Sequence, residues 1–141
     1  MSAKLPIVAR ILFGLVFFVF GLNGFLHFLP QPEHPGPAGA FLGALFATGY
    51  MFPLIKGTEV VAGALLLSGR FVPFALTLLA PIVVNIAAFH LILDPSGAVM
   101  AVVLLALEGY LAWAHRAAFA PLFQPTPAAA ARRVTAEARA V

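Results

Sequence analysis

The sequence predicts an all-α fold: a transmembrane four-helix bundle with a short interfacial helix between the first two long helices. Of its 141 residues, 62% are hydrophobic and only 9% are charged, whereas soluble domains carry about 25% charged residues. The mean hydropathy is +1.04. The apolar residues gather into four runs, each close to the roughly 20 residues that a helix needs to cross a bilayer. The chain is therefore expected to be an integral membrane protein whose main partner is the lipid bilayer.

The first apolar run covers residues 11–29 and follows two basic residues, Lys4 and Arg10. It is longer than the roughly 7 to 15 residues of a signal-peptide core, and no small-residue cleavage site follows it closely. It is therefore expected to stay in the protein as a helix. Residues 30–37 contain four prolines, which remove backbone donors and predict an exposed loop.

Residues 38–49 are too short to span a membrane, but four apolar side chains share one side of a helix there, those of Phe41, Leu42, Leu45 and Phe46. This pattern predicts a short helix in the interface. Three more spans follow at residues 50–68, 71–93 and 98–113, with tight turns between them. Pro81 lies inside the third span and is expected to bend it.

The basic residues predict the orientation, since cytoplasmic loops carry an excess of Lys and Arg. With a cytoplasmic N-terminus, the outer loops hold no Lys or Arg. Residues 1–123 are expected to form the membrane domain, and residues 124–141 a flexible, Ala- and Arg-rich cytoplasmic tail. The basic residues on the inner side are Lys4, Arg10, Arg70, Arg116, Arg132, Arg133 and Arg139.

Composition also excludes several functions. The chain has no cysteine, which excludes disulfides, thiolate metal sites and dithiol redox relays. Its basic residues form no dense stripe with exposed aromatics, so nucleic acid is not an expected partner. No haem, flavin or nucleotide motif is present. No catalytic residue can be assigned.

Polar side chains inside the spans are the candidate site. An ionisable group in hydrocarbon costs at least about 2.5 kcal/mol on insertion scales, so each needs a partner or a wet cavity. Counted at about 1.5 Å per residue, they lie in the outer half of the bilayer or near its midplane, while the inner half of each span holds almost nothing polar. Contributions from four helices at similar depth predict a shared pocket that opens outward. The candidate ligand-binding residues are Asn23, His27, Lys56, Glu59, Asn85, His90 and Glu108.

The sequence separation between these residues predicts which of their side chains can contact each other. Lys56 and Glu59 are three residues apart on one helix face, close enough to pair. Asn85 and His90 are five apart, about 140° around a helix, so they face one spot only if the helix is distorted. Glu108 has no cation near it in sequence; such a carboxyl either takes up a proton or serves a site.

Structural roles compete with these assignments. The Lys56–Glu59 pair can lock the bundle, and Asn85 can hydrogen-bond between helices as intramembrane glue. A metal site is a further alternative that the spacing does not specify; its ligands would be His27, His90, Glu59 and Glu108. Small residues predict close helix contacts, namely Gly14, Gly21, Gly24, Ala62 and Gly63.

Three stretches resemble the DoxX family of small four-helix bacterial membrane proteins. They are residues 13–25, residues 56–73, which begin Lys-Gly-Thr-Glu, and residues 85–95, which read Asn-Ile-Ala-Ala-Phe-His-Leu-Ile-Leu-Asp-Pro. The likeness covers about residues 5–123. It implies that Glu59, Asn85 and His90 are motif positions.

The resemblance implies a multipass protein of the bacterial inner membrane. Named DoxX members are associated with redox complexes, including a thiosulfate:quinone oxidoreductase subunit. A binding and assembly subunit is therefore expected, at most a non-catalytic subunit of a quinone-linked oxidoreductase, with a quinone headgroup as candidate ligand and a membrane or periplasmic redox protein as partner. Two alternatives are a small proton-coupled transporter, which the apolar inner half disfavours, and a purely structural bundle.

Overall fold

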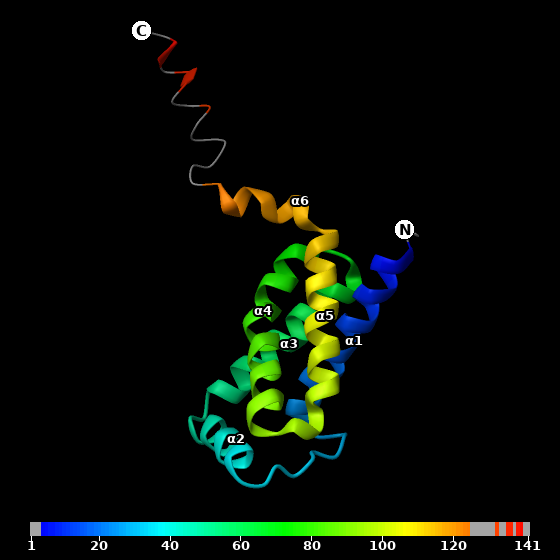
Figure 1. Cartoon of the computed structure of the whole chain (residues 1–141), viewed down its shortest axis with the longest axis vertical. Coiled ribbons are helices and arrows are strands. Elements are labelled where there is room, and N and C mark those ends of the chain that lie inside the picture. Colours follow the sequence, from blue (N-terminus) through cyan, green and yellow to red (C-terminus); the bar gives the residue numbers. More distant parts are fainter. Residues whose placement is uncertain (1–3, 125–131, 133–134, 137, 140–141) are drawn as a thin grey trace.

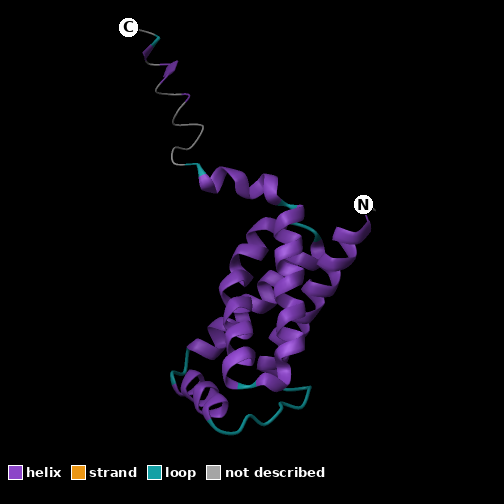
Figure 2. Cartoon of the chain, viewed as in Figure 1, coloured by secondary structure: helices purple, strands orange, loops and turns teal. Residues whose placement is uncertain are grey.

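The computed structural model describes residues 4–124, 132, 135–136 and 138–139, and within these residues every regular element is a helix (Figure 2). The long helices are α1 (Lys4–Leu26), α3 (Met51–Ser68), α4 (Val72–Ala88) and α5 (Ala98–Ala114). A π-helical turn, η1 (Phe89–Leu93), continues α4. The predicted all-α class is confirmed. Most of the predicted tail at residues 124–141 lies outside the described residues.

Four helical segments of the described chain are long and apolar enough to cross a membrane: Lys4–Leu26, Met51–Ser68, Val72–Leu93 and Pro95–Ala114. The chain is therefore a multipass membrane protein. The last three match the predicted spans closely, but α1 begins earlier than the predicted residue 11. Pro6 lies in its first turn, where proline is tolerated, so the helix extends beyond the strongly apolar run.

The short helix α2 (Pro37–Ala47) confirms the one predicted between the first two long helices. It lies at one end of the bundle, while the N-terminal end of α1 and the helix α6 (Arg116–Phe119) lie at the other (Figure 1). The α1–α2 loop runs along the same end of the bundle as α2 (Figure 1). We call this end of the molecule the loop end, and the opposite end the terminal end.

Three one-turn elements were not predicted as helices. The 3-10 turn η2 (Pro95–Gly97) starts α5, and α6 and η3 (Ala120–Phe123) follow it. Pro95 and Pro121 each lie at the start of such an element, where a missing N–H removes no helical hydrogen bond.

The core is apolar, and glycines bring α1 and α3 together. An added Cβ at Gly63 would lie 2.5 Å from the Phe18 backbone nitrogen and 2.9 Å from the Gly14 carbonyl oxygen. An added Cβ at Gly21 would lie 2.9 Å from the Val60 backbone nitrogen of α3. These contacts confirm the predicted close packing, which small residues permit because backbones can then touch. The largest fully buried side chains are Phe13, Leu66, Leu76, Leu79, Leu111 and Val83.

Candidate functional site

A cavity of about 610 Å³ lies at the loop end, bounded by α2, α3, the end of α4 and the α1–α2 loop. All four apolar side chains predicted on one side of the short helix face it, so α2 covers the cavity. Its apolar lining includes Phe41, Leu42, Leu45, Phe46, Met51, Phe52, Ile55, Pro81, Ile82, Ile86 and Phe89. Its polar lining comprises His27, Gln31, His34, Lys56, Glu59, Asn85 and His90.

The Lys56–Glu59 pair forms one polar part of the cavity wall. Lys56 Nζ donates to Glu59 Oε2 at 2.8 Å, which confirms the predicted pairing. The Glu59 side chain is 4% exposed and that of Lys56 is 20% exposed, and both residues line the cavity. The Lys56 ammonium also lies 5.7 Å from the centroid of the Phe52 ring, within the range of a cation–π contact. A Cβ at Gly24 of α1 would overlap the Lys56 side chain, so this glycine leaves room for it.

Asn85 and His90 line the same cavity although they are five positions apart in the sequence. The helix distortion near them is the π-helical turn, in which Asp94 N donates to Phe89 O at 3.0 Å. His90 is oriented by a 3.1 Å hydrogen bond between its Nδ1 and the Asp94 carbonyl oxygen. Asn85 is exposed to the cavity and has no side-chain hydrogen bond within the described chain. Its amide is therefore available to a ligand.

Two of the predicted site residues, Asn23 and Glu108, do not line the cavity. Asn23 is buried at the end of α1, where its Oδ1 accepts from Leu29 N at 2.6 Å and its Nδ2 donates to Leu29 O at 3.4 Å. Asn23 therefore fixes the chain where it leaves α1. His27, which lies between Asn23 and Leu29 in the sequence, has a left-handed φ of 51°. Glu108 is buried on α5.

No metal centre is assembled by the side chains that the structure describes: no group of three or more His, Asp and Glu residues lies close enough to hold an ion. The geometry therefore does not support the alternative of a metal site. One of the four proposed metal ligands, Glu108, does not line the cavity.

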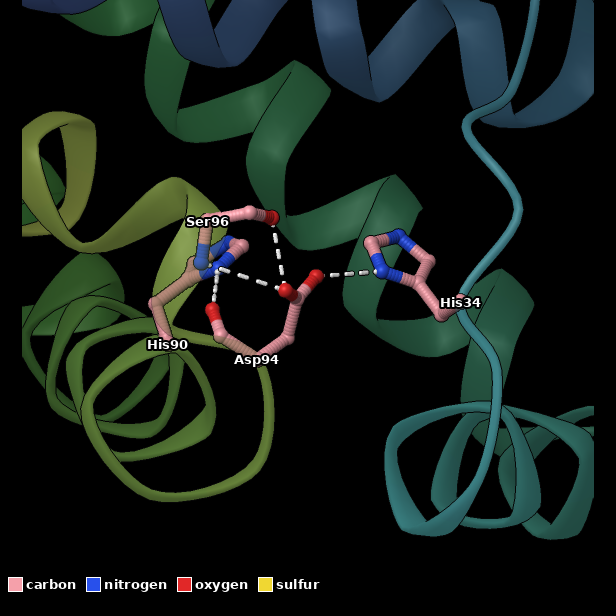
Figure 3. A network of polar contacts seen from close by, with 4 residues as sticks. All are labelled: His34, His90, Asp94 and Ser96. Atoms are coloured by element: carbon pink, nitrogen blue, oxygen red, sulfur yellow. Dashed lines mark hydrogen bonds and ion pairs between the residues drawn. The ribbon is translucent and has the colours of Figure 1, made fainter.

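A polar network that the sequence did not predict joins the α1–α2 loop to the start of α5 (Figure 3). We call His34, His90, Asp94 and Ser96 the loop clasp. Asp94 Oδ2 lies 2.6 Å from His34 Nδ1, and Asp94 Oδ1 accepts from Ser96 Oγ at 2.6 Å and from Ser96 N at 3.2 Å. The Asp-Pro-Ser order is a recognisable capping signal, but nothing local to His34 marks its partner sixty residues away.

Aromatic rings connect the loop clasp to the cavity wall, which His34, Phe89 and His90 line. The Phe89 ring lies 5.5 Å from the His34 ring and 5.9 Å from the Phe41 ring, centroid to centroid. Phe89 thus contacts both the loop and α2. Opening the clasp is expected to free the loop segment that borders the cavity.

The loop clasp is expected to open in acid. The hydrogen bonds from Ser96, and then the contact with His34, hold the pKa of Asp94 below its ordinary value. The carboxylate therefore stabilises the clasp above the ordinary aspartate pKa of about 3.9, and this contribution is lost as the pH falls through the lowered pKa. Because the chain has no cysteine, spin labels on Glu33→Cys and Val99→Cys can report the loop position by pulsed electron paramagnetic resonance. The distance distribution should be narrow at neutral pH and broaden below about pH 3.9.

The matched variant for this test is His34→Ala, which should give a broad distribution at every pH. His115→Ala, at the terminal end, should behave like the parent. A narrow distribution in His34→Ala at neutral pH would show that the loop does not depend on the clasp.

The fold and site define an α-helical, multipass membrane protein with a partly polar cavity at one end of its bundle. No protein-family model, curated protein or solved structure matches the chain.

Proposed function

We propose that this protein is a non-catalytic binding and assembly subunit of a membrane redox complex, of the DoxX type, and that its cavity holds a quinone-like headgroup or a similar small amphipathic molecule. The partner would be a membrane or periplasmic redox protein that carries out electron transfer. The proposal places the protein in the bacterial cytoplasmic membrane.

The cavity has the size and lining that such a ligand needs. Small-molecule sites occupy about 300 to 1,000 Å³ and are mainly apolar with a few oriented polar groups; this cavity measures about 610 Å³. Four phenylalanines line it, Phe41, Phe46, Phe52 and Phe89, and flat rings favour stacked or edge contacts with a planar headgroup. An apolar tail could then remain in the surrounding lipid.

The observation that carries the proposal is the pair of hydrogen-bond donors on the cavity wall. An ammonium carries three N–H donors, and Lys56 uses one of them for Glu59. Asn85 adds an amide with no side-chain partner in the described chain. A quinone has two carbonyl oxygens that accept hydrogen bonds, so these donors match its chemistry while the apolar wall matches its ring.

The charge distribution supports an outward-facing cavity. Arg10 and Arg70 lie toward the terminal end, near the turn between α3 and α4. The α1–α2 loop and the turn before α5, both at the loop end, contain no Lys or Arg. By the positive-inside rule the terminal end would be cytoplasmic, and the cavity would face the opposite side of the membrane.

Removing the Asn85 amide is expected to weaken quinone binding. Asn85→Leu keeps a similar volume and deletes one hydrogen bond worth up to about 1.5 kcal/mol, so the Kd for decylubiquinone should rise by about three- to tenfold. Isothermal titration calorimetry of the full chain in lipid nanodiscs measures this change. The matched control is Val84→Ala, an exposed neighbour on α4 that does not line the cavity, which should keep the parent Kd.

Two further variants, Glu59→Gln and His90→Ala, should lower both decylubiquinone binding and quinone-dependent activity of the assembled complex, without loss of membrane insertion. Parent-like binding in Asn85→Leu, Glu59→Gln and His90→Ala together would reject the cavity as the quinone site. It would leave the structural bundle as the better description.

A further inference from the structure

Helix α5 carries two buried polar atoms that have no hydrogen-bond partner in the described chain, Glu108 Oε1 and Tyr110 Oη. The other buried polar side chains of the spans are satisfied, since Asn23 bonds to Leu29 and Glu59 bonds to Lys56. Glu108 therefore differs from them in having no partner. Tyr110 is two positions further along the same helix, where side chains do not face each other, so neither group satisfies the other.

No cation of the described chain neutralises Glu108. Lys56, within α3, is paired with Glu59 at 2.8 Å. Arg10, within α1, lies against Gly69 at the turn after α3. Glu108 itself is 7% exposed and sits on the buried face of α5 with Leu104 and Leu111. Its Oε1 is thus buried without a partner, and the residue lies outside the ligand cavity.

An ionised carboxyl in such surroundings is unfavourable, because it loses its hydration and gains neither an opposite charge nor donors. The neutral acid avoids most of that penalty. Groups of this kind inside membrane spans are commonly sites of proton binding. We infer that Glu108 is held as a neutral carboxylic acid, a proton-binding site separate from the cavity, and that membrane-soluble carbodiimides modify it. The inference does not depend on what occupies the cavity.

The modification follows from the protonated form. The carboxyl proton passes to one carbodiimide nitrogen while a carboxyl oxygen bonds to the central carbon, which forms an O-acylisourea. Transfer of the acyl group from that oxygen to nitrogen breaks the acyl C–O bond and gives a stable N-acylurea. No group leaves, so the product is the sum of the two reactants. A carboxylate paired with an ammonium, as in Glu59, lacks the proton that this addition requires.

Infrared spectroscopy of the full chain in nanodiscs tests the protonation state directly. At neutral pH the parent should give the C=O stretching band of a protonated carboxylic acid, which shifts to lower frequency in D₂O. Glu108→Gln should remove this band. Glu59→Gln, the matched control, should keep it and lose carboxylate absorption instead. Loss of carboxylate absorption in Glu108→Gln, with no change in the acid band, would overturn the inference.

Dicyclohexylcarbodiimide labelling followed by peptide mass spectrometry provides the second measurement. The peptide containing Glu108 should gain the mass of one reagent molecule in the parent and in Glu59→Gln, and the label should disappear in Glu108→Gln. A label on Glu59 in place of Glu108, or no label on Glu108, would refute the proposed modification site even if the infrared result held.

Discussion

Replacing Lys56 with methionine is expected to lower the free energy of unfolding by about 3–5 kcal/mol, the range measured when one member of a buried ion pair is removed. Methionine keeps most of the side-chain length but leaves the Glu59 carboxylate without the ammonium that lies 2.8 Å away. The Glu59 side chain is only 4% exposed, so water can replace that partner only in part. Unfolding of the ligand-free chain in mixed micelles, followed by circular dichroism as the fraction of denaturing detergent rises, measures the change.

The double variant Lys56→Met/Glu59→Leu separates the loss of the pair from the loss of packing. Replacing both members of a buried pair by apolar groups is often neutral or stabilising, so the double variant should recover most of the stability that the single variant loses. A double variant as unstable as Lys56→Met would mean that the methionine disturbs packing and that the ion pair contributes little.

Hydropathy predicted the helices well because lipid contact imposes a direct requirement on composition. Each span must present apolar side chains over the thickness of the bilayer and satisfy its backbone internally, so long apolar runs and helices coincide. The predicted 50–68 and the observed Met51–Ser68 differ by one residue. The start of α1 was predicted less well. Hydropathy detects only the apolar run, whereas the helix itself extends further toward the N-terminus.

Counting along each helix predicts the height of a candidate site residue but not the direction in which its side chain faces. It gave Asn23 and Glu108 heights similar to that of Glu59, yet of these three residues only Glu59 lines the cavity. Whether a polar side chain faces the cavity, the helix end or the core depends on how each helix is rotated against its neighbours. That rotation is set by packing between residues far apart in sequence, such as Gly63 against Phe18.

The loop clasp could not be predicted for a related reason. A proline-rich sequence predicts an exposed loop because its backbone cannot join regular structure. It does not predict which residues the side chains of the loop contact. His34 contacts Asp94 through side chains alone. Its partner lies beyond two intervening spans, so only the assembled bundle brings the two groups together.

The close contact of α1 with α3 makes Gly63→Ala the second strongly destabilising change. The added Cβ would meet backbone atoms, 2.5 Å from Phe18 N and 2.9 Å from Gly14 O, and backbone cannot turn aside as a flexible side chain can. Overpacking of this kind costs about 1–3 kcal/mol, so the free energy of unfolding in mixed micelles should fall by that amount.

Gly57→Ala is the matched control, because it makes the same change on the same helix where an added Cβ has no neighbour within 4 Å. Both variants gain the helix propensity of alanine over glycine, up to about 1 kcal/mol in soluble peptides, so the difference between them isolates the overlap with α1. Gly57→Ala should therefore be neutral or slightly stabilising. If both variants unfolded at the same detergent fraction, α1 and α3 could separate enough to accept a methyl group, and their close approach would not be a requirement of the fold.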